Sequence, residues 1–331
     1  MSLPLLRKAK SSAGRDRPAR PPQAAPAPAV RLVEVDESHH GQRLDNFLLR
    51  LCKGVPKSHL YKAIRGGEVR VNKGRVAVDH RIESGDLVRV PPFRLPEVPV
   101  RFVPPSEFPI VFEDDALLAI DKPAGVAVHG GSGVDFGVIE QLRRARPQAK
   151  FLELVHRLDR DTSGLLLVAK KRNALVGLHQ SLRDGLWNKH YLAMVAGDWV
   201  NDRQHVRKPL LKWTTQSGER RVRVDQDGQP AHTIFVLRQR YGAYSLLDAE
   251  LKTGRTHQIR VHLLSCGFPI VGDDKYGDEA ANAGAAALGF RRMFLHAHTL
   301  CVPHPLTGEA LAFQADLPQD CLDFIKKLEN P

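Results

Sequence analysis

The chain has little of what membrane-spanning, secreted and metal-binding proteins rely on. No uncharged apolar run approaches the roughly 18 residues that a membrane helix needs. The basic N-terminus lacks the apolar segment and cleavage site of a secretory signal. Only four cysteines occur, without the spacing of a disulfide framework or a Cys-x-x-Cys motif: Cys52, Cys266, Cys301 and Cys321. These absences favour a cytoplasmic protein with free, buried thiols.

Acidic residues are scarce relative to basic ones. The 331 residues include 49 lysines and arginines but 37 aspartates and glutamates, which gives a net charge of +12. Such an excess points to a polyanionic partner, nucleic acid first and an anionic membrane surface second. Residues 1–30 hold six basic residues and one acidic one, and residues 31–92 hold twelve and eight. Most of the excess therefore lies in the first 92 residues.

Length and local composition predict the domain organisation. A chain of 331 residues with 42% hydrophobic and 26% charged residues is typical of a soluble protein with two domains. Residues 1–30 are rich in proline and alanine, which predicts a disordered basic tail, either without function or a weak RNA-tethering arm. Proline-rich residues 93–109 predict a linker between a first domain at 31–92 and a second at 110–328.

The first domain has the pattern of two short helices and a small sheet. Apolar residues from Leu44 to Leu51 follow helical spacing, and a second helix is expected from an N-cap at Ser58 to Arg65. Alternating residues predict strands at 31–35, 68–72, 75–78 and 86–90. Basic residues crowd the helices and the turn: Lys53, Lys57, Lys62, Arg65, Arg70, Lys73 and Arg75. Cations on a small scaffold suit contacts to phosphates.

This segment resembles an S4 RNA-binding domain. The resemblance runs through Gly41-Gln-Arg-Leu-Asp-Asn-Phe-Leu48, Gly67-Glu-Val-Arg-Val-Asn-Lys73 and Glu83-Ser-Gly-Asp-Leu-Val-Arg-Val90. It implies a small αL-type fold in which two helices and the following loop hold structured RNA. The seven basic residues are accordingly candidate RNA contacts.

The second domain alternates strands and helices without a regular strand–helix repeat. Strands are expected at 110–112, 117–120, 164–169, 243–251, 294–302 and 311–313, and helices at 137–144 and 173–184. We therefore expect an α+β fold with a mixed, largely antiparallel central sheet flanked by helices.

A polar loop at 156–164 separates two apolar segments and is the best candidate for a site. Judged by residue type, Asp159 or Asp161 could be a nucleophile or a general base. Ser163 and His156 leave a hydrolase open, although Thr-Ser-Gly is not the Gly-x-Ser-x-Gly elbow. The alternative is a hydrogen-bonded turn that only orders the loop. No histidine or cysteine spacing suggests a metal site.

Four motifs in order resemble the RluA family of pseudouridine synthases, over about residues 110–315. They are Asp121-Lys-Pro-Ala-Gly125, His156-Arg-Leu-Asp-Arg-Asp-Thr-Ser-Gly164, Lys189-His-Tyr-Leu-Ala-Met-Val-Ala-Gly197 and Thr253-Gly-Arg-Thr-His-Gln-Ile-Arg-Val-His262. The family converts uridine to pseudouridine in RNA. The whole-length match, S4 segment included, favours members that act on 23S ribosomal RNA or the assembling large subunit.

The resemblance also implies a role for each site residue. Asp159 would be the catalytic aspartate and Arg260 its salt-bridge partner, while Tyr191 would stack on the target base. Arg157 would fill the gap that a flipped nucleotide leaves in the stack, because the base cannot be reworked inside a helix. Arg255 and His257 would support substrate binding.

The chemistry agrees with this assignment and needs no cofactor, because no oxidation state changes. A carboxylate can attack C1′ or C6 or assist elimination to a glycal, and the sequence leaves these routes open. Desolvation would raise the pKa of Asp159, and a nearby Arg260 would oppose that shift. The rival functions are a synthase for other ribosomal or transfer-RNA uridines, and a non-catalytic S4-type ribosome-assembly factor. We expect a monomer.

Overall fold

The computed structural model describes residues 29–52, 54–93, 102–131 and 134–330. The chain forms two compact units, residues 1–98 and 99–331, and each has a hydrophobic core of its own. Residues 1–28 of the tail expected at 1–30 lie outside the described residues, as do Lys53 and residues 94–101 of the linker expected at 93–109.

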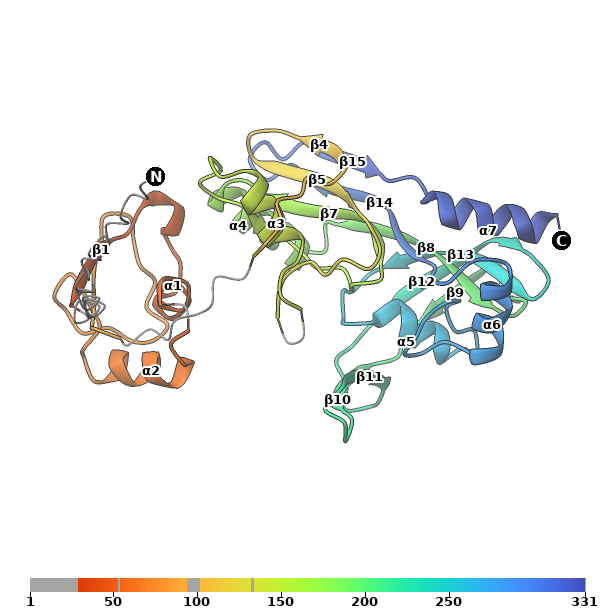
Figure 1. The fold of residues 1–331 in the computed structure, drawn as a ribbon, viewed down its shortest axis with the longest axis horizontal. Coiled ribbons are helices and arrows are strands. Elements are labelled where there is room, and N and C mark those ends of the chain that lie inside the picture. The colour runs from red at the N-terminus through yellow and green to blue at the C-terminus, as the bar shows by residue number, and fades with distance from the viewer. Residues whose placement is uncertain (1–28, 53, 94–101, 132–133, 331) are drawn as a thin grey trace, which may run out of the picture. The chain divides into compact units, whose positions relative to one another are not determined.

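In the first unit two helices pack on a three-stranded antiparallel sheet of order β1-β3-β2 (Figure 1). Its elements are β1 (Arg31–Glu34), the 3-10 helix η1 (Glu37–His39), α1 (Leu44–Leu51), α2 (Lys57–Arg65), β2 (Arg70–Val71) and β3 (Leu87–Val90). Leu48 of α1 and Ile64 of α2 are buried in the same core as Val88 of the sheet. The helical spacing of the apolar residues therefore identified α1 correctly, and the helix expected up to Arg65 is α2.

Two details of this unit differ from expectation. Helix α2 begins at Lys57 with Pro56 as its N-cap, because the Pro56 carbonyl already accepts the amides of His59 and Leu60. Ser58 is therefore not the cap. Residues 75–78 form no strand: β1 and β2 already occupy both edges of β3, and the alternating valines instead pack half-buried on the core.

The second unit is built on a ten-stranded mixed sheet of order β4-β5-β7-β14-β8-β13-β12-β9, to which β6 and β15 add on β7 and β14. Strands β7 and β14 pair in parallel, and the other neighbours in this sheet pair antiparallel. The strands are β4 (Ile110–Glu113), β5 (Leu117–Lys122), β6 (Glu153–Leu154), β7 (Ser163–Ala169), β8 (Asn188–Ala196), β9 (Arg203–Val206), β12 (Thr233–Arg240), β13 (Tyr244–Leu251), β14 (Leu295–Pro303) and β15 (Ala310–Gln314). The expected mixed, largely antiparallel α+β fold is confirmed.

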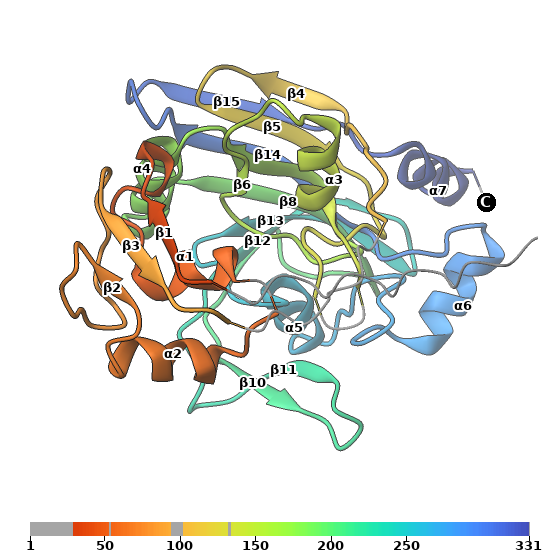
Figure 2. The same ribbon diagram turned by 60° about the vertical axis from the view of Figure 1, so that its left-hand side comes forward.

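The described residues of the second unit also form five helices and a hairpin that is separate from this sheet. The helices are α3 (Val138–Ala145), α4 (Arg172–Arg183), α5 (Gln258–Leu264), α6 (Glu279–Ala287) and α7 (Gln319–Glu329). Strands β10 (Leu210–Thr214) and β11 (Arg220–Val224) form a separate antiparallel hairpin that extends away from the sheet beyond α5 (Figures 1 and 2). The periodicity of the sequence had not indicated this hairpin, nor helices α5, α6 and α7.

The cysteines are all free thiols. Cys52 and Cys321 are buried and Cys266 is half-buried, but Cys301 is exposed, so the expectation of buried thiols is wrong for that residue. No helix of the described residues is long and apolar enough to cross a membrane.

Candidate active site

The polar loop singled out in the sequence connects the short strand β6 to the fully buried strand β7. The loop closes in a turn in which the Thr162 amide donates to the Asp159 carbonyl at 3.2 Å. Gly164, with φ of 104°, lies where β7 meets β14, and a Cβ atom there would lie 2.3 Å from the Ala297 carbonyl oxygen. Only glycine allows this close approach, which places the loop at the end of the central strands.

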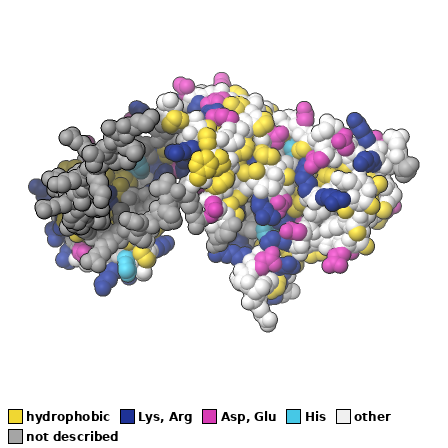
Figure 3. Space-filling view, in the orientation of Figure 1, with side chains coloured by type: hydrophobic (Ala, Val, Ile, Leu, Met, Phe, Trp, Pro, Cys, Tyr) yellow, Lys and Arg dark blue, Asp and Glu magenta, His cyan; other side chains and the backbone are white. Residues whose placement is uncertain are grey.

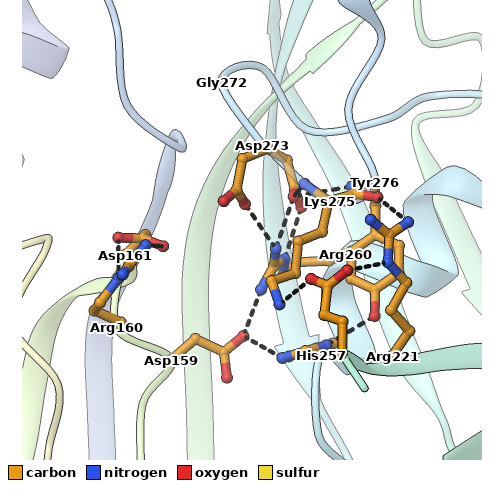
Figure 4. Close-up of polar contacts among 12 residues, drawn as sticks. Asp159, Arg160, Asp161, Arg221, His257, Arg260, Gly272, Asp273, Lys275 and Tyr276 are labelled. Carbon is orange, nitrogen blue, oxygen red and sulfur yellow. Dashed lines mark hydrogen bonds and ion pairs between the residues drawn. The ribbon is translucent and has the colours of Figure 1, made fainter. Parts of the chain in front are cut away.

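Arg260 of α5 holds two carboxylates at once (Figure 4). Its Nη1 lies 3.1 Å from Asp159 Oδ2, and its Nε and Nη2 each lie 2.7 Å from an oxygen of Asp273. The Arg260 side chain is 4% exposed and that of Asp273 is fully buried. Burial alone would raise the pKa of Asp273, but the two-pronged contact from Arg260 lowers it. The guanidinium is therefore fixed in place and presents its remaining edge to Asp159.

His257 forms the other side of the Asp159 environment. Its Nε2 lies 3.8 Å from Asp159 Oδ2, and its Nδ1 lies 2.8 Å from the hydroxyl of Tyr276. The residue precedes α5 in the left-handed conformation, with φ of 54°. The left-handed conformation is strained for a residue other than glycine. It persists where the surrounding contacts enforce it, often at functional sites.

Tyr191 reaches the same place from β8, where it pairs with Ala249 of β13 and Ala297 of β14. The residue is only 8% exposed. Burial, reinforced by the charge of Asp159, raises the pKa of its phenol well above the ordinary value. The hydroxyl is accordingly neutral at physiological pH.

All six residues expected at the site from the sequence line one cleft with a volume of about 620 Å³. They are Arg157, Asp159, Tyr191, Arg255, His257 and Arg260. Asp159 is 19% exposed, and Arg157 and Arg255 are exposed. The cleft thus combines a partly accessible carboxylate, a buried aromatic ring and two accessible cations.

Sequence reasoning missed several residues of this site. Lys189 and Trp187 line the cleft, and Lys189 lies two positions before Tyr191, on the same face of β8. The period of two in a strand could have identified it. Burial lowers the pKa of Lys189. Asp273, the second partner of Arg260, lies outside helices and strands, so local periodicity gives no comparable signal for it.

Lys122 contacts the backbone of the polar loop at 156–164 from the end of β5. It is fully buried at the end of β5, and its ammonium donates to the carbonyl oxygens of Pro123, Val126 and Arg160, at 2.7, 2.9 and 3.0 Å. Burial lowers its pKa to about 8. Because Arg160 follows Asp159 directly, this contact helps to fix the backbone of the loop.

The contacts of Ser163 and His156 do not support a hydrolase. Ser163 is 1% exposed, and its hydroxyl pairs with the buried His296 Nδ1 at 2.9 Å rather than with His156. His156 Nε2 accepts the amide of Leu167 at 3.1 Å, and burial lowers the pKa of this imidazole to about 4. Both residues therefore satisfy internal hydrogen bonds. Among the described residues no three His, Cys, Asp or Glu side chains form a group that could hold a metal ion.

The candidate RNA contacts of the first unit lie on α2 and around the turn after β2. The described members of this set are all exposed: Lys57, Lys62, Arg65, Arg70, Lys73 and Arg75. Lys57 and Arg65 flank the ring of Tyr61, with their cationic groups 5.1 and 5.9 Å from its centroid. In Figure 3 basic side chains are visible around the edge of this unit. Lys53 belongs to the same set but lies outside the described residues.

The second unit thus combines a mixed sheet with a carboxylate–guanidinium pair in a cleft, and the first unit resembles an S4 RNA-binding domain. Residues 116–265 match the family model described as RNA pseudouridylate synthase, and residues 42–88 match the S4 domain. The chain belongs to the RNA pseudouridylate synthases, which isomerise uridine to pseudouridine, and it carries an S4 domain before the catalytic domain. The resemblance seen in the sequence is thereby confirmed.

Curated relatives are similar over nearly the whole chain. Ribosomal large subunit pseudouridine synthase C of Pasteurella multocida (strain Pm70) is 51% identical over 296 residues, which cover 87% of this chain and 91% of the relative. The enzyme of that name from Escherichia coli (strain K12) is 49% identical over 312 residues, 92% and 98% of the two chains. The solved structure of human RNA pseudouridylate synthase domain containing 4 shares the fold, with a TM-score of 0.56 and 24% identity, over 67% of this chain and 93% of that one.

Proposed function

We propose that this synthase isomerises selected uridines of 23S ribosomal RNA, as free RNA or in the assembling large subunit. The names of the curated relatives support the choice of substrate, and so does the S4 domain. The observation that carries the proposal is the Asp159 carboxylate, held 3.1 Å from a fixed guanidinium in a cleft large enough for one nucleotide.

In this reaction the N1–C1′ bond of uridine breaks and the uracil turns. A C5–C1′ bond then forms, the C5 proton leaves, and N1 is protonated, so that substrate and product are isomers. We assign the carboxylate step to Asp159, by attack at C1′ or C6 or by assisted elimination to a glycal; the nucleophilic routes split one difficult step into easier ones. Arg260 favours the ionised carboxylate that these routes need.

Tyr191 and Arg157 are assigned to the handling of the base. The neutral, buried ring of Tyr191 offers a flat surface on which a flipped uracil stacks. Removal of the C5 proton by its phenolate would be easier once Asp159 has lost its negative charge in a covalent intermediate, because that charge raises the pKa of Tyr191. Arg157, exposed beside the cleft, would occupy the gap in the RNA stack.

Other residues are assigned to holding the RNA. Arg255 and His257 would contact the substrate at the cleft, and the exposed cations of α2 and of the turn after β2 would bind phosphates. We also propose that the enzyme acts as a monomer. We place the enzyme in the cytoplasm, with ribosomal RNA.

The test compares Asp159→Asn with Asp161→Asn, a matched loss of charge two positions along the same loop. Both purified full-length variants are incubated with 23S RNA, and pseudouridine is mapped by primer extension after carbodiimide treatment. With Asp159→Asn, pseudouridine should be absent from every site that the wild type modifies, whereas Asp161→Asn should still form it at those sites. Modification of transfer RNA alone by the wild type would assign the enzyme to another substrate.

A further inference from the structure

The hydroxyl of Tyr276 links the β10–β11 hairpin to the active site (Figure 4). Tyr276 is 7% exposed, and its ring packs in a small core with Val222 of β11 and Val261 of α5. The hydroxyl oxygen accepts the amide of Val222 at 2.9 Å and lies 2.8 Å from His257 Nδ1. One buried oxygen therefore has two nitrogen neighbours.

Only one placement of the protons at this contact gives every donor and acceptor a hydrogen-bond partner. The Val222 amide can only donate, so it occupies a lone pair of the phenol oxygen. The phenol has a single proton, and among the described residues His257 Nδ1 is the acceptor recorded within reach of it. A proton on Nδ1 would instead leave the buried hydroxyl proton without an acceptor, which costs free energy. Nδ1 is therefore the acceptor.

Because Nδ1 accepts a hydrogen bond, the protonation state of the other ring nitrogen of His257 is also fixed. In a neutral imidazole one nitrogen carries the proton and the other accepts, so His257 Nε2 must be the N–H. That nitrogen is the one that faces Asp159 Oδ2, at 3.8 Å. Burial lowers the pKa of His257, against the opposing charge of Asp159, while Arg260, Lys275 and Asp273 also face the ring. The neutral imidazole is thus the relevant form at physiological pH.

We propose that Tyr276 is a positioning residue that sets the tautomer of His257, so that His257 presents an N–H donor to the Asp159 carboxylate and to the uridine bound there. The hairpin contributes by holding the tyrosine: Glu219 beside β11 pairs with Lys275, and Arg221 donates to the Lys275 carbonyl at 3.2 Å. The inference deepens the proposed function, on which its kinetic part rests.

The direct test is the protonation pattern of His257 in the full-length protein, labelled with ¹⁵N-histidine and observed in long-range ¹H–¹⁵N spectra. The His257 signals are assigned by their loss in His257→Gln. The wild type should show a protonated Nε2 and an unprotonated Nδ1, and Tyr276→Phe should give a mixture or the opposite tautomer. A protonated Nδ1 in the wild type, or an unchanged pattern in Tyr276→Phe, would overturn the proposal.

Kinetics provide the second arm. Tyr276→Phe should lower the single-turnover rate about 10-fold, the effect of one hydrogen bond, with KM for RNA unchanged. Tyr244→Phe is the matched control, because it removes another buried hydroxyl, which donates to the Ala281 carbonyl at 3.2 Å, and it should have no effect on the rate.

His257→Gln separates the tautomer from other effects of the hydroxyl. The Gln amide nitrogen can stand where Nε2 stands and always donates. Adding Tyr276→Phe to this variant should therefore have little further effect. An equal loss in both backgrounds would mean that the hydroxyl acts independently of the His257 imidazole, and would overturn the proposal. If the wild type forms no pseudouridine in 23S RNA, the proposed function fails, while the spectra still decide the tautomer.

Discussion

The N-terminal unit keeps its candidate RNA-binding cations exposed on α2 and around a turn, whereas the catalytic unit buries its most important cation. Arg260 is 4% exposed and divides its donors between Asp159 and Asp273. Exposed cations lose interaction strength as salt rises, because ions screen them and compete for phosphate. A buried guanidinium is screened far less, and its two-pronged hydrogen bonds fix the positions of the carboxylates that it contacts. We therefore expect the two units to separate attraction of RNA from orientation of the reacting groups.

The largest effect should come from Arg260→Met. Removal of the guanidinium leaves Asp273 as a buried, unpaired carboxylate, which should lower the free energy of unfolding by about 3–5 kcal/mol. Urea denaturation of the full chain measures this loss. The control is Arg223→Met, which removes an exposed partner of Asp225 and should leave the transition unchanged. Similar curves for both variants would mean that Arg260 is not the stabilising partner of Asp273.

Lys122 should produce the next largest effect, and only at high pH. Its pKa is about 8 in the folded protein, against about 10.4 for an unfolded lysine, so the unfolded chain binds more protons between these values. The free energy of unfolding should therefore rise with pH across this window, by up to about 3 kcal/mol from this group. Urea unfolding at several pH values should show that rise in the wild type and in Lys57→Met, but not in Lys122→Met. An identical pH dependence in Lys122→Met would contradict the assignment.

The cations of α2 should contribute mainly to affinity. Replacement of Lys57, Lys62 and Arg65 by Gln should weaken RNA binding about 10- to 30-fold at physiological salt and lower the slope of log K against log salt by about 2–3. The rate at saturating RNA should remain unchanged. Binding titrations at several salt concentrations measure both quantities.

The control for this prediction carries the same loss of charge on the exposed surface of the catalytic unit, at Arg144, Lys171 and Lys326. It should leave the slope nearly unchanged. If instead the α2 variant keeps the wild-type slope, the S4 domain is not the main electrostatic anchor.

The smallest effect should follow Ser163→Ala. The buried His296 Nδ1 loses its partner, which should cost about 1–2 kcal/mol of stability without slowing pseudouridine formation. Ser58→Ala, at an exposed position of α2, should change neither quantity. Thermal denaturation and a single-turnover assay decide between this structural role and a catalytic one.

Local patterns in the sequence predicted much of this molecule. The spacing of Leu44 and Leu48 predicted α1, and the continuous apolar run at 164–169 predicted β7. The motif resemblance selected six residues that the structure brings into one cleft, although their catalytic roles remain predictions. Alternation at 75–78 was misleading, because a period of two also arises from irregular chain that packs on a core.

The sequence by itself determined the family, the order of the domains and the residue types that the reaction needs. Only the tertiary structure decided which partners those residues have. Arg260 meets Asp159 across 101 positions of chain, and Val222 meets Tyr276 across 54. Helix and strand periods arise between neighbours in sequence, so they can be read locally. Hydrogen bonds between distant segments depend on strand order and packing, and those emerge only when the whole sheet has formed.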